Sequence, residues 1–274
     1  KKFISRMRGY HGVTIASGSL TGLPMVHTDF DLPIKNVLHT TCPHFYRGGQ
    51  EGETEEQFTD RMAKDLDELI QREGPETIAA FIAEPIMGAG GVVVPPMSYF
   101  PKINAVLEKY DVRFIADEVI CGFGRTGNWF GTQTFGMKAT SISVAKAITS
   151  AYFPMSAITI EEDLYQAMVD ESKKIGTFGH GFTYTAHPVG CAVALKTIEI
   201  YQRDRIVEHV RKMAPVFKAR LDKLPTHLEV RILNDILREA DVKEPLPLDL
   251  IDKAVMDGPR LPSPEVGAEN APPV

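Results

Sequence analysis

Two strand-like apolar runs that each lead to a charged residue are the feature that most constrains this fold. Residues 113–120 read as a buried strand that carries Asp117, and residues 140–145 read as the next strand, directly before Lys146. Charged groups are rarely placed at the ends of inner strands unless another group pairs with them. The two runs therefore predict an inner sheet with a functional pair at one of its edges.

The rest of the chain alternates between strand-like and helical patterns. Further strands are expected at 79–86 and 156–160, and amphipathic helices at 53–73 and at about 99–110. From residue 187 to about 224 the pattern is almost continuously helical, with a break near Asp204. This alternation favours an α/β fold with a mostly parallel sheet and helices on both faces.

The composition argues against several classes of function. The 274 residues include 43% hydrophobic residues and carry a net charge of −6, without a Lys/Arg block interleaved with aromatics, so we expect no nucleic-acid partner. The three cysteines have no metal-ligand spacing, which predicts no metal site and a reducing compartment, with the cytoplasm as the default location. No apolar run reaches membrane-spanning length, so we expect no membrane partner. Because the chain does not begin with Met, we expect a fragment or a processed product.

Lys146 and Asp117 together suit one cofactor, pyridoxal 5'-phosphate (PLP). PLP needs an amine for its aldehyde and a carboxylate for its ring nitrogen, which an anion keeps protonated. Because residues i and i+2 of a strand share a face, we expect Val119 to point the same way as Asp117 and to pack on the ring. Taken singly, Asp117 could cap a loop and Lys146 could extend along a strand edge into solvent. Their placement at adjacent strand ends, where open α/β sheets bind ligands, favours the cofactor.

A glycine-rich loop between the two strands makes the pattern specific. Asp117-Glu118-Val119 is followed by Gly122-Phe123-Gly124-Arg125-Thr126-Gly127 and then by Lys146. This order resembles the signature of class III aminotransferases, which are fold-type I PLP enzymes. The resemblance runs from about residue 3 to residue 224. It implies the large domain of a PLP-dependent transferase, in which Lys146 is the Schiff-base lysine and Asp117 is the partner of the ring nitrogen.

Three other segments resemble the same family in the same order. Gly9-Tyr10-His11-Gly12 resembles the segment whose aromatic ring stacks on the cofactor, which implies cofactor contacts for Tyr10 and His11. Glu84-Pro85-Ile86 resembles a strand-to-loop element beneath the active site, where Glu84 acts as a hydrogen-bonding anchor. His180-Gly181-Phe182-Thr183-Tyr184 resembles the segment whose threonine reaches the PLP phosphate of a neighbouring subunit, which implies a homodimer. Taken alone, Tyr10 could be a core residue and Thr183 a turn residue.

Finer differences within the family concern the substrate. Ile120 stands where many members carry a glutamine, and Cys121 and Trp129-Phe130-Gly131 follow it. Ala89 stands where the ornithine branch carries a glutamate. These residues resemble the omega-amino acid–pyruvate branch more than the ornithine or 4-aminobutyrate branch.

The chain also departs from the family pattern. Ala139-Thr140 replaces the usual Pro-Asp before the lysine strand, which predicts a looser loop there. The family's phosphate-binding turn would precede Lys1, and most of its small domain would follow Leu224, so we expect both ends to be incomplete and the cofactor to be held weakly. The expected organisation is a partial PLP-binding large domain at 1–186, a helical segment leading to the small domain at 187–227, and a disordered proline-rich tail at 228–274.

The resemblance implies transfer of an amino group from an amine or omega-amino acid to a keto acid such as pyruvate, through a Lys146 Schiff base. Two other hypotheses stay open at this point. One is a class III aminomutase or decarboxylating relative. The other is a catalytically impaired remnant that only folds and associates.

Overall fold

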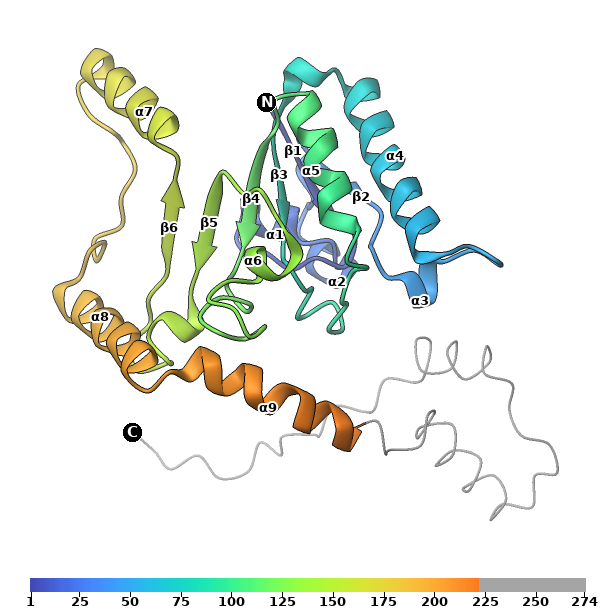
Figure 1. Ribbon diagram of the computed structural model, residues 1–274. Coiled ribbons are helices and arrows are strands. Elements are labelled where there is room, and N and C mark those ends of the chain that lie inside the picture. Colours follow the sequence, from blue (N-terminus) through green and yellow to red (C-terminus); the bar gives the residue numbers. More distant parts are fainter. Residues whose placement is uncertain (222–274) are drawn as a thin grey trace, which may run out of the picture. The chain divides into compact units, whose positions relative to one another are not determined.

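The computed structural model describes residues 1–221 (Figure 1). The chain divides into two compact units, Lys1–Ala214 and Pro215–Val274, and the fold below is that of the first. Of the second unit only residues 215–221 are described, and they form the last part of a helix. The expectations for 222–227 and for the proline-rich tail at 228–274 lie outside the described residues.

Six strands form one sheet in the first unit, in the order β2-β1-β3-β4-β5-β6. Every neighbouring pair is parallel except β5 and β6, which are antiparallel. The mostly parallel sheet is therefore confirmed. The strands are β1 (Lys2–Arg6), β2 (Val37–Thr40), β3 (Ile78–Ala83), β4 (Arg113–Asp117), β5 (Ser141–Val144) and β6 (Ala157–Ile160).

The helices alternate with the strands along the chain. They are α1 (Ile15–Leu20), α2 (Pro24–His27), α3 (Phe45–Gly48), α4 (Glu55–Glu73), α5 (Tyr99–Lys109), α6 (Gly131–Phe135), α7 (Glu162–Ile175), α8 (Pro188–Arg203) and α9 (Ile206–Leu221), with short 3-10 turns η1 (Pro75–Thr77) and η2 (Lys146–Ile148). The break between α8 and α9 falls at Asp204, as the sequence predicts. No helix within residues 1–221 is long and apolar enough to cross a membrane.

Helices cover both faces of the sheet near β1. Ile4 is fully buried in the main core together with apolar side chains of α4 and α5, which lie side by side in Figure 1. The next residue, Ser5, points to the opposite face because side chains alternate along a strand. Its hydroxyl donates a hydrogen bond of 2.6 Å to the carbonyl of Leu20 at the end of α1. Neighbouring side chains of β1 therefore contact helices on opposite faces.

The predicted amphipathic helix at 53–73 is present as α4. Thr54 and Gln57 cap its first turn, since each accepts a hydrogen bond from the other's backbone N–H. The expected apolar stripe is buried against the sheet and α5, and consists of Phe58, Met62, Leu66 and Ile70. Burial of such a face, rather than intrinsic propensity, supplies most of the stability of a helix in a protein.

Two expectations about strand ends are wrong. The strand expected at 113–120 ends at Asp117, and Val119 lies in the turn that follows. Alternation along a strand therefore does not place Val119 beside Asp117, because the extended backbone stops before it. The strand expected at 79–86 likewise ends at Ala83, so Glu84 lies just beyond it.

The loop expected to be loose at Ala139-Thr140 is held by the threonine. The Thr140 hydroxyl accepts a hydrogen bond from the Phe114 N–H and donates one to the Phe114 carbonyl, both at 3.0 Å. The Thr140 N–H donates to the same carbonyl at 2.8 Å. Thr140 thus pins the start of β5 to β4 without the family's Pro-Asp pair.

Candidate active site

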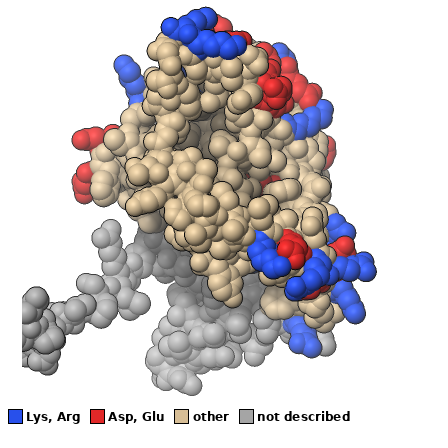
Figure 2. Space-filling model, turned by 90° about the vertical axis from the view of Figure 1, so that its left-hand side faces the viewer, with Lys and Arg blue, Asp and Glu red and all other residues tan. Residues whose placement is uncertain are grey.

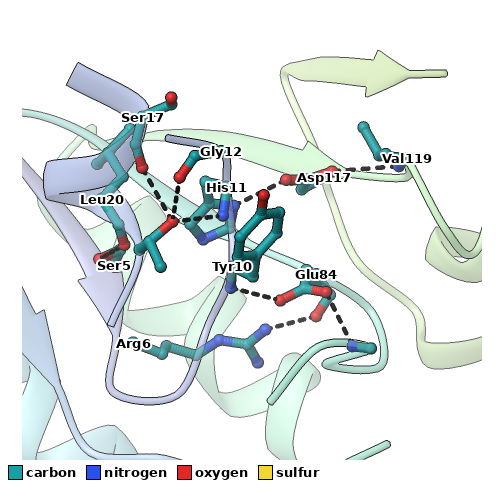
Figure 3. A network of polar contacts seen from close by, with 12 residues as sticks. Ser5, Arg6, Tyr10, His11, Gly12, Ser17, Leu20, Glu84, Asp117 and Val119 are labelled. Atoms are coloured by element: carbon teal, nitrogen blue, oxygen red, sulfur yellow. Dashed lines mark hydrogen bonds and ion pairs between the residues drawn. The ribbon is translucent and has the colours of Figure 1, made fainter. Parts of the chain in front are cut away.

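The parallel strands bring the predicted site residues to one edge of the sheet. Parallel strands have their carboxyl ends at the same edge, which is where open α/β sheets bind ligands. Asp117 ends β4, Glu84 directly follows β3, and Lys146 follows β5 by two residues. The Tyr10–His11 segment comes after β1 and joins the same group of contacts (Figure 3).

Asp117 is buried and already oriented by two contacts. Its side chain is 8% exposed, and its Oδ2 lies 2.8 Å from His11 Nδ1. Its Oδ1 accepts a hydrogen bond of 3.1 Å from the Val119 N–H. A carboxylate offers about four lone-pair positions, so two contacts leave room for a further donor such as a protonated ring nitrogen.

His11 is the residue that supports Asp117. Because a carboxylate only accepts, the proton between the two groups belongs to His11 Nδ1. The imidazole is 2% exposed, and its Nε2 is buried without a hydrogen-bond partner in the part of the chain that the structure describes. The His11 N–H donates to the Thr21 hydroxyl at 2.9 Å, which fixes the backbone of this segment.

Glu84 ties the Tyr10 segment to the loop after β3. Its carboxylate accepts hydrogen bonds from the N–H groups of Tyr10 and Gly88, both at 2.9 Å. Figure 3 shows that this carboxylate lies close to the backbone of Tyr10, next to the His11–Asp117 pair. Glu84 thus holds two backbone segments together, and its place beneath a cofactor stays a prediction.

Arg6 is a member of this network that sequence reasoning missed. It is 1% exposed, and its guanidinium donates a hydrogen bond of 2.6 Å to the Glu84 carbonyl. The same group lies 5.5 Å from the ring centroid of Phe100 and 5.9 Å from that of Tyr99. Cation–π contacts of this kind compensate in part for the loss of water around a buried charge. An arginine as the last residue of an apolar strand was the available signal.

Lys146 occupies an unusual backbone conformation just after β5. It begins the turn η2 with φ 46°, in the left-handed region. That region costs about 1–2 kcal/mol for a residue with a side chain, and such outliers cluster at functional sites. The side chain is exposed, and its Nζ makes no hydrogen bond or ion pair with any of residues 1–221. The amine is thus available to a ligand.

Thr183 stands apart from these residues. It lies exposed in the segment between α7 and α8, and no contact within residues 1–221 joins its hydroxyl to Asp117, Lys146 or Tyr10. A threonine that serves a neighbouring subunit would have this exposure, but so would an ordinary surface residue.

Glu118 has a structural role that the sequence did not suggest. It is fully buried, and its carboxylate accepts hydrogen bonds from the N–H groups of Gly131 and Thr132 at 2.9 and 2.6 Å. Burial raises its pKa above the ordinary value, although the two N–H groups act in the opposite direction. Glu118 thereby closes the loop 119–130 at its base. Its position beside Asp117 was visible in the sequence, but which carboxylate faces the interior was not.

The residues present fit PLP. This cofactor requires an amine, a carboxylate for its ring nitrogen and an aromatic ring to pack on. Lys146 supplies an exposed amine, Asp117 a carboxylate with spare lone pairs and Tyr10 the ring. Beside Asp117, the buried His11 Nε2 has no hydrogen-bond partner among residues 1–221 and could bond to a polar atom of a ligand. Cavities of about 320 and 510 Å³ lie elsewhere, around Met7 and His39, and neither is lined by Asp117 or Lys146. The strand-end geometry, rather than cavity size, therefore locates the site.

Comparison with known proteins settles the family. Residues 1–239 match the family described as Aminotransferase class-III. The chain belongs to the class III aminotransferases. Enzymes of this family depend on PLP, which agrees with the donor set at the strand ends.

Curated relatives include transaminases from plants. Gamma aminobutyrate transaminase 3, chloroplastic, from Solanum lycopersicum is 56% identical over 218 residues, which are 80% of this chain and 42% of the relative. Gamma-aminobutyrate transaminase 1, mitochondrial, from Oryza sativa subsp. indica is 53% identical over the same share of each protein. The chain thus spans less than half the length of these relatives.

Solved transaminases share the fold. A transaminase with L-Ala matches with a TM-score of 0.81 and 58% identity, over 83% of this chain and 54% of that structure. The omega transaminase from Pseudomonas jessenii in complex with PMP matches with a TM-score of 0.82 and 51% identity, over 83% of this chain and 50% of that structure. The predicted PLP-transferase large domain is confirmed.

Proposed function

We propose that the protein to which this chain belongs moves an amino group from an amine or omega-amino acid to a keto acid such as pyruvate, with PLP held at Lys146. The observation that carries this proposal is the pair of adjacent strand ends. In the register of β4 and β5, Asp117 is opposite Ser143, three residues before Lys146. A buried carboxylate and an amine that makes no ion pair within residues 1–221 thus occupy neighbouring ends of two parallel strands.

Each residue has a distinct task in this proposal. PLP, when bound, withdraws electrons from the amino donor and so makes its Cα–H acidic. Asp117 holds negative charge beside the ring nitrogen, and His11 keeps that carboxylate in place through its Nδ1–H. Tyr10 packs against the ring, and Val119 contacts it from the turn after β4. Lys146 would hold the cofactor through its aldehyde. Once the donor's amine has displaced the lysine from that carbon, the freed Nζ would take the proton from the carbon that bears the donor's amino group, as a general base.

The choice of donor and acceptor rests on finer features. Ile120, Cys121 and Ala89 support an omega-amino acid–pyruvate enzyme, and omega transaminases are among the structural neighbours. The curated relatives named above are gamma-aminobutyrate transaminases, so 4-aminobutyrate belongs among the donors to be compared. Ala89 is exposed and cannot pair with a charged substrate-binding residue.

We also propose a homodimer in which Thr183 and its neighbours contact the cofactor phosphate of the partner subunit. Its exposure in the segment before α8 supports this role.

For location we propose the cytoplasm, which the sparse cysteines favour. The two plant relatives are named as chloroplastic and mitochondrial, so fractionation of cells that express the tagged protein is the measurement that decides location.

The activity can be tested with a panel of donors. The 274-residue chain is incubated with PLP, pyruvate and beta-alanine, 4-aminobutyrate, ornithine or a simple primary amine, and alanine formation is measured. We expect alanine with the omega-amino acid or amine donors, and none with Lys146→Ala. Lys138→Ala is the matched control, because Lys138 is an exposed lysine that pairs with Glu108 at 2.7 Å. Equal alanine formation by the parent and Lys146→Ala would contradict the proposal.

A further inference from the structure

The turn that carries Lys146 contains several strained residues. Besides Lys146 at φ 46°, Ser150 has φ 48° and Ala151 has φ 65°, all in the left-handed region. Such values are uncommon for residues other than glycine. Three of them within six residues persist only if the surrounding contacts hold the backbone in place.

Tyr201 of α8 supplies two of these contacts. Its hydroxyl lies 2.8 Å from the Ala147 carbonyl and 2.5 Å from Ser150 Oγ. A phenol carries a single proton, which Tyr201 donates to the carbonyl because the carbonyl can only accept. Ser150 must therefore donate to the Tyr201 oxygen. One hydroxyl thus ties the residue after Lys146 to the far end of the same turn.

The tyrosine ring is itself held in place. Its centroid lies 6.4 Å from that of Phe123 in the glycine-rich loop. Figure 1 shows α8 beside the turn that follows β5, and residues of α8 and η2 are in contact. The Ala147 carbonyl also accepts the Ser150 N–H at 3.2 Å. The Tyr201 hydroxyl consequently adds a bond from α8 to a turn whose Thr149 hydroxyl also donates to the Phe153 carbonyl at 2.6 Å.

We propose that Tyr201 is a positioning residue for Lys146. The left-handed φ of Lys146 sets the direction of its Cα–Cβ bond, and hence where its amine can reach. Without the Tyr201 hydroxyl, the turn can relax towards ordinary backbone angles that aim the amine elsewhere. The effect of Tyr201 on the cofactor rests on the proposed function. Its hydrogen bonds to the turn do not depend on that function.

The experiment compares Tyr201→Phe with Tyr165→Phe. The first removes only the hydroxyl and keeps the ring that packs on Phe123. The second is the matched control, because Tyr165 lies on α7, is 52% exposed, and its hydroxyl makes no hydrogen bond with any of residues 1–221. Two quantities are measured in each variant. One is amide hydrogen exchange at Ile148, Thr149 and Ser150 without cofactor, and the other is the affinity for PLP with the pH midpoint of the bound cofactor's absorbance.

We expect exchange in the turn to become about three- to tenfold faster in Tyr201→Phe, as befits the loss of one hydrogen bond. The affinity for PLP should fall by a similar factor, and the pH midpoint of the absorbance should move, because the environment of the Lys146 amine changes. Tyr165→Phe should match the parent in every measurement. Ser150→Ala should reproduce part of the effect, and the double variant Tyr201→Phe/Ser150→Ala should be less affected than the product of the two single changes.

Unchanged exchange in the turn of Tyr201→Phe would overturn the inference, whatever the cofactor does. Faster exchange with an unchanged affinity and pH midpoint would also overturn it, since Tyr201 would then stabilise the turn without positioning the amine. If the parent does not bind PLP at Lys146, the proposed function fails. In that case faster exchange at Ile148–Ser150 still supports the hold of Tyr201 on the turn.

Discussion

At the scale of single residues, the proposed function requires a negative charge on Asp117. It is a buried carboxylate whose contacts are both hydrogen-bond donors, His11 Nδ1 and the Val119 N–H. An asparagine at this position keeps the shape but carries no charge, and its amide NH₂ would face one of the two donors. The charge, rather than the shape, is what a protonated ring nitrogen needs.

Asp117→Asn should therefore lower alanine formation at saturating PLP by about 100-fold or more, in the range of a lost acid–base contribution. The expected loss is in turnover, with a smaller change in cofactor affinity. Asp170→Asn is the control, because Asp170 is a surface carboxylate paired with Lys173. A turnover for Asp117→Asn within a few-fold of the parent would contradict the role given to Asp117.

Cys121 offers a residue-scale prediction that depends on pH. Burial raises the pKa of its thiol to about 11, and the residue is 1% exposed. With this raised pKa only about 0.1% of the thiol is thiolate at pH 8, against roughly a quarter of an unperturbed thiol. Alkylation of Cys121 by iodoacetamide in the folded protein should be about 100-fold slower than in denaturant, and slower than that of the half-buried Cys191 in the folded protein.

The rate at Cys121 should still rise steeply between pH 8 and pH 10, since its thiolate fraction keeps growing there. Peptide mass spectrometry of timed samples measures both cysteines in one experiment. In denaturant the two rates should become equal. Equal rates in the folded protein would show that Cys121 is not buried as described.

The sequence pointed to candidate site residues but was less informative about their hydrogen-bond partners. Asp117, Lys146, Tyr10 and Glu84 could be named from motifs, and the strand ends bring them to one edge. Arg6 and Glu118 could not, because their contacts join segments 78 and 13–14 residues away along the chain. Nothing in the local pattern states which distant N–H or carbonyl a buried charge will meet.

At the scale of elements, the segment after β1 is held by close backbone approaches. A Cβ at Gly22 would lie 2.2 Å from the Arg6 carbonyl oxygen and 2.7 Å from the Met7 Cα. Backbone atoms cannot move away as a flexible side chain could. The Gly22 N–H donates to the Gly9 carbonyl, and the Gly22 carbonyl accepts from the Arg8 N–H, both at 2.8 Å. Gly22 thus fixes the path that leads to Tyr10 and His11.

Gly22→Ala should accordingly lower the free energy of unfolding by about 3 kcal/mol or more, at the upper end of the cost of overpacking. Gly181→Ala is the matched control, because a Cβ there would meet no atom of residues 1–221 within 4 Å. Urea denaturation followed by circular dichroism measures both variants. A loss below about 0.5 kcal/mol in Gly22→Ala would mean that the segments are not packed as closely as described.

Periodicity located the elements well, and their ends less well. The stripe of Phe58, Met62, Leu66 and Ile70 predicted α4 because a buried helical face repeats every three to four residues. The run through Val119 suggested a longer strand than β4, because apolar residues in a buried turn look the same as those in a strand. The loop before β5 was also misjudged from the sequence. Its missing proline suggested a loose backbone, but the hydrogen bonds of the Thr140 side chain to Phe114 hold it in place.

At the scale of the whole molecule, the first unit has a face with few charges. Figure 2 views the side with β6, α7 and α8, and its charged residues lie mostly at the margins. In the segment before α8, Phe178, Phe182 and Tyr184 are 50, 78 and 79% exposed. Clusters of exposed apolar side chains mark association surfaces on soluble proteins. Thr183 lies within this segment.

The chain should therefore sediment as a dimer at micromolar concentration. Phe182→Asp should weaken association by at least about tenfold, because a charge would have to lose its water in the interface. Met97→Asp is the control, since Met97 is 62% exposed and precedes α5 in another part of the fold. A parent chain that sediments as a monomer would contradict both the dimer and the role proposed for Thr183.

Borohydride reduction shows whether Lys146 forms a covalent bond with the cofactor. The purified chain is mixed with PLP, reduced, digested and mapped by mass spectrometry, beside Lys146→Ala and Lys138→Ala. We expect a phosphopyridoxyl group on the peptide that contains Lys146 in the parent and in Lys138→Ala, and its loss in Lys146→Ala. Labelling spread over surface lysines, and unchanged in amount by Lys146→Ala, would contradict this expectation.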